Sequence, residues 1–302
     1  MEVPYATPPQ TPIEPHEGRF SSTVMPISEY RPDPGGRRAV VILGMPDDTG
    51  VKLNNGRPGA REGPGAIRRA LARVGVDNPA KRPWPLVYDA GDVLPAGDDL
   101  DETHRRVSEA SKALASYGFF PVGFGGGHDL TFAFVRGVID GLPEDQKPCA
   151  GEYFDPHLDV RETKGSGMPF RRLIEDCGVN SLRISGFNPI VNTAEHYEWF
   201  KAHGGRRAQP YGYDRLPERP YFASLDLDAI ECCAAPGVSA ANPCGQSAFS
   251  AAHWLSDAVA SPYIRCFDIM ELSPPHDVND RTARLAAHLF LRALQFIKLG
   301  TP

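Results

Sequence analysis

The sequence predicts a three-layer α/β/α domain with a mainly parallel sheet, and three observations carry that prediction. Apolar, β-rich runs alternate with segments of helical periodicity from about residue 39 onward, and this alternation is typical of parallel sheets covered on both faces. The runs are short and contain few polar residues, as expected of strands buried on both faces. No internal repeat or shift in composition divides the 302 residues. We therefore expect a single domain over residues 37–302.

The predicted elements follow one another in the order that such a fold requires. Strands are expected at Ala39–Met45, Pro85–Asp89, Phe119–Phe124, Gly151–Phe154, Ser181–Phe187, Tyr221–Leu227 and Ile264–Met270. Apolar residues three and four apart predict helices, at Pro64–Val74, Leu100–Tyr117, Leu130–Ile139, Ala194–His203, Ser247–Ala260 and about Asp280–Ile297. Residues 1–36 are rich in proline and polar residues and show no period. We expect them to form an extended N-terminal arm packed on the domain or on a neighbouring subunit.

Composition excludes several classes of protein. The net charge of -6 argues against a general nucleic-acid binder, which needs a basic surface. No apolar run is long enough to span a membrane, and residues 1–10 lack the basic end and apolar core of a secretory signal. The six cysteines are therefore expected to be reduced thiols in a cytoplasmic protein. The sequence leaves open whether the chain forms a homo-oligomer.

Metal-ligating side chains follow three of the predicted strands. In open parallel sheets, ligands bind at the carboxyl ends of the strands, so these positions are the place to look. The first motif reads Phe-Gly-Gly-Gly-His-Asp and provides His128. The second reads Tyr-Phe-Asp-Pro-His-Leu-Asp and provides Asp155, His157 and Asp159. The third reads Ser-Leu-Asp-Leu-Asp and provides Asp226 and Asp228.

The spacing and the charge of these side chains predict a metal site. Alternate residues of an extended chain share a face, so the three ligands of the second motif are expected to point one way, as are the two of the third. Two imidazoles and four carboxylates place too much negative charge in one pocket for all of them to ionise unaided. Two divalent cations would balance that charge, and mixed His and carboxylate ligands suit manganese, with zinc as an alternative.

Each motif also has a simpler interpretation when it is taken alone. The three glycines and His128 suit a plain strand–helix turn, in which the glycines permit a sharp bend and the histidine caps the helix. An isolated Asp-x-Asp is often a solvated strand end. The occurrence of all three motifs, in chain order and each at a strand end, favours the metal site over these separate explanations.

Taken together, the three motifs resemble those of the ureohydrolase (arginase/agmatinase) family. In that family Gly-Gly-x-His, Asp-x-His-x-Asp and Ser-x-Asp-x-Asp motifs bind two manganese ions. The resemblance extends from about Val40 to the C-terminus and implies an arginase-like fold with two Mn²⁺ per subunit. It implies that one ion is held by His128, Asp155, Asp159 and Asp226. It implies that the other is held by Asp155, His157, Asp226 and Asp228.

The same resemblance implies two catalytic residues. A hydroxide between the metals would be the nucleophile, and Asp159 would hydrogen-bond that hydroxide and pass its proton to the leaving nitrogen. Glu271 ends the last predicted strand, in the stretch Asp-Ile-Met-Glu-Leu-Ser-Pro-Pro, and would bind the cationic end of the substrate. A carboxylate suits that role because it can pair with two N–H groups of a planar amidinium. The simpler interpretations of Glu271 are a helix cap or a surface carboxylate.

Further residues resemble formimidoylglutamases within this family. Arginases and agmatinases carry a histidine before a Gly-x-Pro step, and Ser166 occupies that position here, in the stretch Ser-Gly-Met-Pro-Phe. Arg161 lies two residues after the second motif, and Asn192-Thr193 and Ala235-Pro-Gly-Val-Ser-Ala240 also match. The resemblance therefore implies a substrate-binding set of Arg161, Ser166, Asn192 and Glu271.

The expected reaction is hydrolysis of the C–N bond of N-formimidoyl-L-glutamate to L-glutamate and formamide, a step of histidine degradation. An arginine can grip a substrate carboxylate with two parallel hydrogen bonds, and Arg161 is the first candidate, ahead of Arg57, Arg171 and Arg172. One alternative is another amidino or guanidino hydrolase, such as an agmatinase, guanidinobutyrase or arginase, that releases urea. A mononuclear zinc deacetylase-like enzyme and a non-catalytic homologue are the remaining alternatives.

The chain departs from the family pattern at several positions. Pro156 replaces the usual alanine and removes a backbone N–H, which a strand end tolerates. Glu231-Cys232-Cys233 replaces an Asp-Pro step after the third motif, and both cysteines are expected to be packed in the interior. His253 and His276 are expected to be ordinary surface histidines.

Overall fold

The computed structural model describes residues 1–33, 38–75, 85–208 and 215–298. Within these residues the strands are β1 (Ala6–Thr7), β2 (Val24–Pro26), β3 (Val40–Met45), β4 (Val87–Val93), β5 (Phe120–Gly125), β6 (Ala150–Phe154), β7 (Ser181–Ser185), β8 (Gly205–Arg207), β9 (Tyr221–Asp226) and β10 (Ile264–Met270). They form one sheet in the order β1-β4-β3-β5-β10-β9-β6-β7-β8, with β2 also paired to β4. Only β1 runs antiparallel to its partner among the described pairs. The prediction of a mainly parallel sheet is confirmed.

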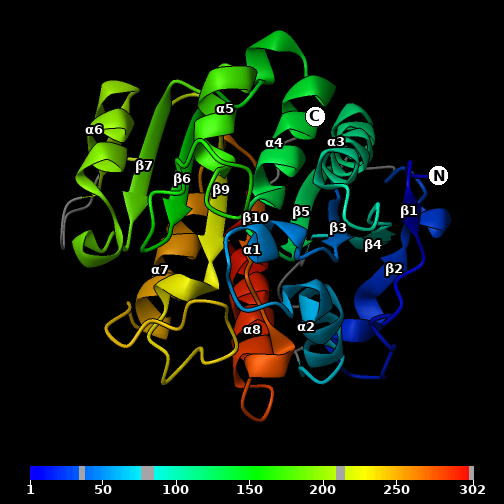
Figure 1. Cartoon of the computed structure of the whole chain (residues 1–302). Helices are drawn as coiled ribbons and strands as arrows, with labels where there is room; N and C mark the ends of the chain where they lie inside the picture. The colour runs from blue at the N-terminus through cyan, green and yellow to red at the C-terminus, as the bar shows by residue number, and fades with distance from the viewer. Residues whose placement is uncertain (34–37, 76–84, 209–214, 299–302) are drawn as a thin grey trace.

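Helices cover both faces of this sheet, as Figure 1 shows. They are α1 (Thr49–Leu53), α2 (Gly63–Leu71), α3 (Leu100–Ser116), α4 (Leu130–Gly141), α5 (Pro169–Cys177), α6 (Ala194–Ala202), α7 (Ala248–Val259) and α8 (Arg281–Phe296). Alternate residues of β3 enter two separate cores: Val40 belongs to the core that includes residues of α2, α7 and α8, and Val41 to the core that includes residues of α3 to α6. This division follows from the period of two along a strand. None of the described helices is long and apolar enough to cross a membrane.

The strand predicted at Pro85–Asp89 lies a few residues later, at Val87–Val93. The sequence pattern ended the strand too early because Asp89 and Asp92 interrupt the apolar run. Both carboxylates are buried and bind the fully buried Arg68 of α2, whose Nε is 2.8 Å from Asp89 Oδ2 and whose Nη1 is 2.5 Å from Asp92 Oδ1. Paired charges can be accommodated in the interior where lone charges cannot.

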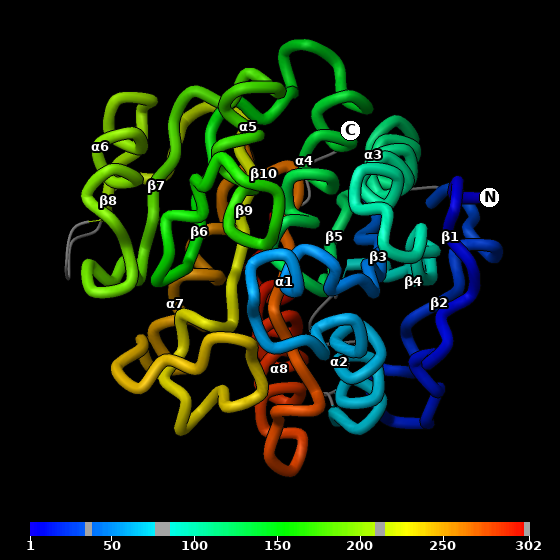
Figure 2. Tube along the Cα trace, viewed as in Figure 1, coloured from blue at the N-terminus to red at the C-terminus, as the bar shows by residue number. Residues whose placement is uncertain are grey.

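The N-terminal residues line one edge of the sheet. In Figure 2 the blue trace runs beside β4, where β1 and β2 both pair with that strand. Strands of two and three residues are too short to show a period, which is why the sequence indicated only an extended arm. The predicted boundary between residues 36 and 37 lies outside the described residues, so the division into arm and domain stays a prediction.

The central strands end at one edge of the sheet, and this alignment positions the site. Gly125 pairs in register with Met45, Phe124 with Ile269, and Asp226 with Met270. Phe154 pairs with Leu225 on the next strand pair. The residues that follow β5, β6, β9 and β10 therefore emerge together.

Candidate metal centre

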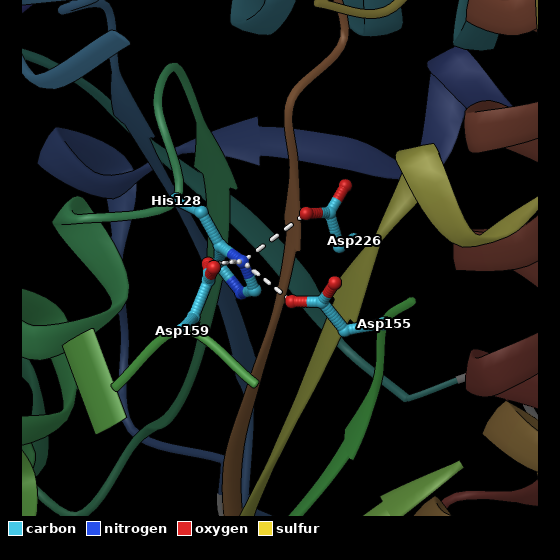
Figure 3. Close-up of side chains that lie close together, drawn as sticks. All are labelled: His128, Asp155, Asp159 and Asp226. Atoms are coloured by element: carbon cyan, nitrogen blue, oxygen red, sulfur yellow. Dashed lines mark ion pairs between the residues drawn. The ribbon is translucent and has the colours of Figure 1, made fainter. Parts of the chain in front are cut away.

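Three carboxylates surround one ring nitrogen of His128, as the dashed lines in Figure 3 show. Nδ1 of His128 lies 3.1 Å from Asp155 Oδ2, 3.0 Å from Asp159 Oδ2 and 3.2 Å from Asp226 Oδ2. None of these contacts meets the geometry of a hydrogen bond, and Nδ1 is buried without a hydrogen-bond partner. The three carboxylates thus converge on Nδ1 of His128.

The other ring nitrogen of His128 indicates which tautomer the site favours. Nε2 lies 3.0 Å from Ser224 Oγ, and the Ser224 hydroxyl donates to Asp268 Oδ1 at 2.6 Å. Since its one hydrogen is used there, Ser224 accepts from Nε2–H, and the hydrogen-bond network assigns a lone pair to Nδ1. A metal-binding histidine typically donates its second N–H in this way.

The site requires positive charge at Nδ1. Burial opposes protonation of His128, but its contacts with Asp155, Asp159 and Asp226 outweigh burial and raise its pKa well above the ordinary value. In the absence of metal a proton would therefore occupy the point at which the carboxylates converge. A divalent cation meets the same demand and uses the lone pair of the favoured tautomer.

A second group of ligands adjoins the first. The ligand atoms of His128, Asp155, Asp159 and Asp226 lie within 4.8 Å of one another, and so do those of His157, Asp226 and Asp228. Asp226 belongs to both groups. Asp155 Oδ1 is also 3.3 Å from His157 Nδ1, and one oxygen each of Asp155 and Asp228 is buried without a hydrogen-bond partner. All six predicted ligands are brought together, and they fit two adjacent divalent cations.

Two matching turns bring the ligands together. Asp155 Oδ1 accepts from the backbone N–H of His157 at 2.7 Å, and Asp226 Oδ1 accepts from that of Asp228 at 2.7 Å. Each is a local aspartate turn, in which the side chain bonds the backbone two residues on. In both aspartates the other oxygen, Oδ2, faces His128. In each turn, the same aspartate therefore bends the chain with one oxygen and offers the other oxygen as a candidate metal ligand.

The ligands do not lie on extended strands, as their spacing predicted. That prediction is wrong because β6 ends at Phe154 and Asp228 lies in a 3₁₀ turn, Leu227–Ala229. Asp159 adopts a left-handed backbone with φ of 48°, which is uncommon for a residue with a side chain. Local hydrogen bonds, and not strand alternation, direct the side chains toward one point.

The carboxylates of the cluster disfavour one another's charge. Burial, followed by the charge of Asp155, raises the pKa of Asp226 to about 6. Burial, followed by the charges of Asp226 and Glu271, raises the pKa of Asp228 well above its ordinary value. Such shifts are expected when like charges share a site shielded from water, and bound cations would reverse them.

Glu271 follows the end of β10 and is buried beside the cluster. Its Oε1 accepts from the backbone N–H of His128 at 2.8 Å, and its own N–H donates to the Gly126 carbonyl at 2.9 Å. The latter contact depends on glycine, because a Cβ at position 126 would meet the Asp47 carbonyl oxygen at 1.8 Å. Oε2 of Glu271 is buried and has no hydrogen-bond partner. This environment excludes a surface role and leaves one oxygen to pair with a cationic group.

A cavity of about 200 Å³ opens over the cluster. Its wall includes all of the predicted substrate-binding residues, which are Arg161, Ser166, Asn192 and Glu271. It also includes Asn54, whose amide donates to Ser166 Oγ at 3.0 Å, and His196 on the first turn of α6. Sequence reasoning missed these last two residues. The signal for Asn54 was its place in the stretch from Gly50 to Ala60, which also resembles formimidoylglutamases, and the signal for His196 was its position shortly after Asn192-Thr193.

Comparison with known proteins now decides the family. A sequence model of the arginase family matches residues 38–295.

The chain belongs to the arginase family.

Several members of this family are similar over most of the chain. The formimidoylglutamase of Aromatoleum aromaticum is 34% identical over 93% of this chain and 89% of the relative. That of Nocardia farcinica is 31% identical over 83% and 84%. A crystal structure of Trypanosoma cruzi formiminoglutamase with Mn²⁺ superposes with a TM-score of 0.77 at 28% identity, covering 85% of this chain and 93% of that one. The proclavaminate amidino hydrolase of Streptomyces clavuligerus gives 0.75 at 25% identity, covering 96% and 97%.

Membership of the arginase family makes this chain a hydrolase that acts on C–N bonds of amidino groups.

The four candidate arginines differ in whether their guanidinium groups are already bound by the protein. Three of the four candidates bind groups of the chain itself: Arg57 binds the Val238 and Ser239 carbonyls, Arg171 binds Glu175, and Arg172 binds Asp176. Arg161 lines the cavity, and its guanidinium has no ion pair among the described residues.

Two histidines and two cysteines that the sequence singled out are not part of the cavity wall. His253 contacts Asp257, and His276 Nε2 lies 3.1 Å from the Pro58 carbonyl. The prediction of interior packing is wrong for Cys233, which is exposed, while Cys232 is half-buried. Cys233 lies in the loop after β9, where isolated β-bridges join Ile230 to Gln246 and Glu231 to Asn242, and not in the sheet.

Proposed function

We propose that this chain is a formimidoylglutamase, a binuclear manganese hydrolase that converts N-formimidoyl-L-glutamate and water to L-glutamate and formamide. One observation carries the proposal. The wall of a single cavity contains the buried, unpartnered carboxylate oxygen of Glu271 and the guanidinium of Arg161. A substrate with a cationic amidine at one end and carboxylates at the other matches both groups.

The ligand set supports manganese as the cofactor. Mixed imidazole and carboxylate ligands suit Mn²⁺, and zinc is the alternative. The similar Trypanosoma cruzi structure contains Mn²⁺. When bound, two divalent cations would lower the pKa of a water molecule toward neutrality and so supply the nucleophile. One site would use His128, Asp155, Asp159 and Asp226, and the other would use His157, Asp226, Asp228 and Asp155.

The chain's own residues position the reacting groups. Glu271 orients the amidinium through Oε2, while its Oε1 is held by the His128 N–H. Asp159 belongs to the metal-binding group and also lines the cavity, so it can accept a proton from the attacking water and deliver it to the leaving nitrogen. The water oxygen bonds to the amidine carbon, the bond from that carbon to the glutamate nitrogen breaks, and formamide and glutamate leave.

The positively charged Arg161 in the cavity wall would bind the carboxylate end of the substrate. Arg161 is placed there by packing, since a Cβ added at Gly167 would meet its Cδ at 2.9 Å. Ser166 accepts from Asn54 and would keep its hydroxyl hydrogen for a substrate oxygen. Agmatine carries no carboxylate, so Arg161 offers it no favourable contact.

A guanidino hydrolase is the second candidate. Its support is the likeness to proclavaminate amidino hydrolase over nearly the whole chain. A mononuclear deacetylase is disfavoured because Asp226 belongs to two adjacent ligand groups, one of which includes His128. The test is a product assay on manganese-loaded protein with N-formimidoyl-L-glutamate and a panel of guanidino acids. Formamide as the fastest-formed product supports the proposal, and urea as the fastest-formed product favours the second candidate.

Other parts of the proposal rest on the sequence and the relatives together. The role in histidine degradation follows from the proposed substrate. A cytoplasmic location and the absence of nucleic-acid binding stay predictions, and whether the chain forms a homo-oligomer stays open.

A further inference from the structure

The side chain of Asn192 is fully occupied by the protein itself. Its Nδ2 donates to the Pro156 carbonyl at 2.8 Å and to the Asn188 carbonyl at 2.7 Å. Its Oδ1 accepts from the backbone N–H of Leu158 at 2.9 Å. An asparagine amide has two N–H donors, so no donor remains for a substrate carboxylate. Although Asn192 lines the cavity, its amide faces the backbone.

These hydrogen bonds hold the backbone on both sides of the candidate metal ligand His157. Pro156 and Leu158 are the immediate neighbours of His157, and Asn192 holds the carbonyl of the first and the N–H of the second. His157 is the most exposed of the ligands, with 28% of its side chain accessible, and its described side-chain contact is with Asp155. Its orientation therefore depends on the backbone on either side of it.

The hydrogen bonds from Asn192 matter because the chain has left the sheet at this point. β6 ends at Phe154, and Pro156 has no N–H to continue a strand ladder. Without Asn192, the buried backbone N–H of Leu158 would lose its described partner, which is costly. The Asn188 N–H also donates to the Pro156 carbonyl at 3.0 Å. The segments that follow the neighbouring strands β6 and β7 are thus joined by the Asn192 side chain and by this backbone bond.

We infer that Asn192 is a positioning residue that holds His157 in place for the second metal ion, and not a residue that binds the substrate. The inference rests on the binuclear site of the proposed function but not on the identity of the substrate. It assigns a different role to a residue that the sequence suggested for substrate binding. The hydrogen bonds of Asn192 thus connect the cavity wall at residues 191–193 to the segment around His157.

Metal binding to the full-length, metal-free protein tests the inference directly. Manganese titration by calorimetry would compare the wild type with Asn192→Ala and Asn192→Asp. The aspartate keeps the acceptor for Leu158 but turns an oxygen toward two carbonyls, so repulsion replaces two hydrogen bonds. We expect both variants to bind the second equivalent at least tenfold more weakly and to bind the first with little change. Asn180→Ala, an exposed asparagine outside this network, is the matched control and should titrate like the wild type.

Kinetics separate positioning from substrate binding. At saturating manganese, a positioning role predicts KM for formimidoylglutamate within about twofold of the wild type, with kcat recovering as manganese increases. A raised KM at saturating metal, or unchanged affinity for the second metal in the folded variants, would overturn the inference. If Asn192→Ala does not fold, the same readouts on Asn192→Asp decide the question. A wild-type protein that binds only one metal would instead refute the proposed binuclear site.

Discussion

The backbone N–H of His128 donates a hydrogen bond to Oε1 of Glu271 at 2.8 Å. The two residues follow adjacent strands, β5 and β10, and the contact joins the peptide group of a metal ligand to the carboxylate assigned to the substrate. In the proposed function, this contact sets the position of the substrate's cationic end relative to the metal cluster. Because Glu271 adopts a left-handed backbone with φ of 67°, this placement is sustained against conformational preference.

Glu271→Gln is expected to weaken catalysis without removing metal. The amide oxygen can still accept from the His128 N–H, but the variant loses the charge that pairs with an amidinium. A hydrogen bond to a charged group contributes about 2–3 kcal/mol, so kcat/KM should fall roughly 30- to 150-fold. Steady-state kinetics and metal analysis on the same preparation check this. Loss of bound manganese in the variant would show that Glu271 supports the cluster and not the substrate.

Asp228→Asn is expected to disrupt the second metal site. Asp228 belongs to the ligand group that includes His157 and Asp226, and its buried Oδ1 has no hydrogen-bond partner. Replacing a carboxylate ligand with a neutral amide should weaken the second manganese by at least ~10-fold and lower turnover by orders of magnitude, while the fold remains. Circular dichroism and a manganese titration are the measurements. Full activity with a single bound metal would mean that the third motif is misplaced.

Arg161→Met tests recognition of the substrate carboxylate. Methionine keeps an apolar stem but loses the guanidinium. Arg161 is exposed in the substrate-free protein, so the contact is discounted for solvent to about 1–2 kcal/mol, and KM should rise roughly 5- to 30-fold. Arg171→Met is the matched control and should leave KM unchanged, because Arg171 is paired with Glu175 on α5. Equal loss of activity on charged and uncharged amidines would show that Arg161 acts only through the structure.

The pH dependence of stability in the metal-free protein follows from the cluster. Burial raises the pKa of Asp226 to about 6, so the folded state holds an extra proton and loses stability as pH rises from about 4 to 6. Burial opposes charge on His157, but Asp155 raises its pKa to about 9. That stabilisation is complete below about 6.5 and is lost as pH rises through 9.

Both shifts therefore predict that the metal-free protein is less stable at pH 8 than at pH 5. The expected difference in Tm is roughly 5 °C, and added manganese should raise Tm more at pH 8, where the ligands are deprotonated. Scanning calorimetry with and without metal is the check, with Asp226→Asn as the control that should remove the part of the metal-free loss between about pH 4 and 6. An equal effect of manganese at both pH values would contradict this account.

The sequence predicted the metal ligands well because they belong to short local motifs. His128, Asp155, Asp226 and the other ligands were predicted from residue type, order and position at strand ends, and the structure gathers all six. The route by which they converge was not predictable from strand periodicity. It depends on side-chain hydrogen bonds to N–H groups two residues on, which occur where the strand has already ended.

Contacts between distant segments were also hidden from the sequence. The family resemblance alone placed Asn192 among the substrate-binding residues. Its bonds to backbone atoms 34 and 36 residues away could not be predicted, because backbone atoms leave no residue pattern. Likewise, Asp89 and Asp92 read as the end of a strand because Arg68, which neutralises them, comes from a separate helix. Burial of charge is decided by such tertiary pairs and not by the local run.

The most direct test of the account is activity measured against the number of manganese ions bound per chain. Metal-free protein would be titrated with Mn²⁺ while formamide release from N-formimidoyl-L-glutamate is followed and urea is assayed in parallel. The account predicts that formamide production appears with the second equivalent and saturates at two ions per chain, without urea. Saturation of binding and activity at one ion would contradict the binuclear site.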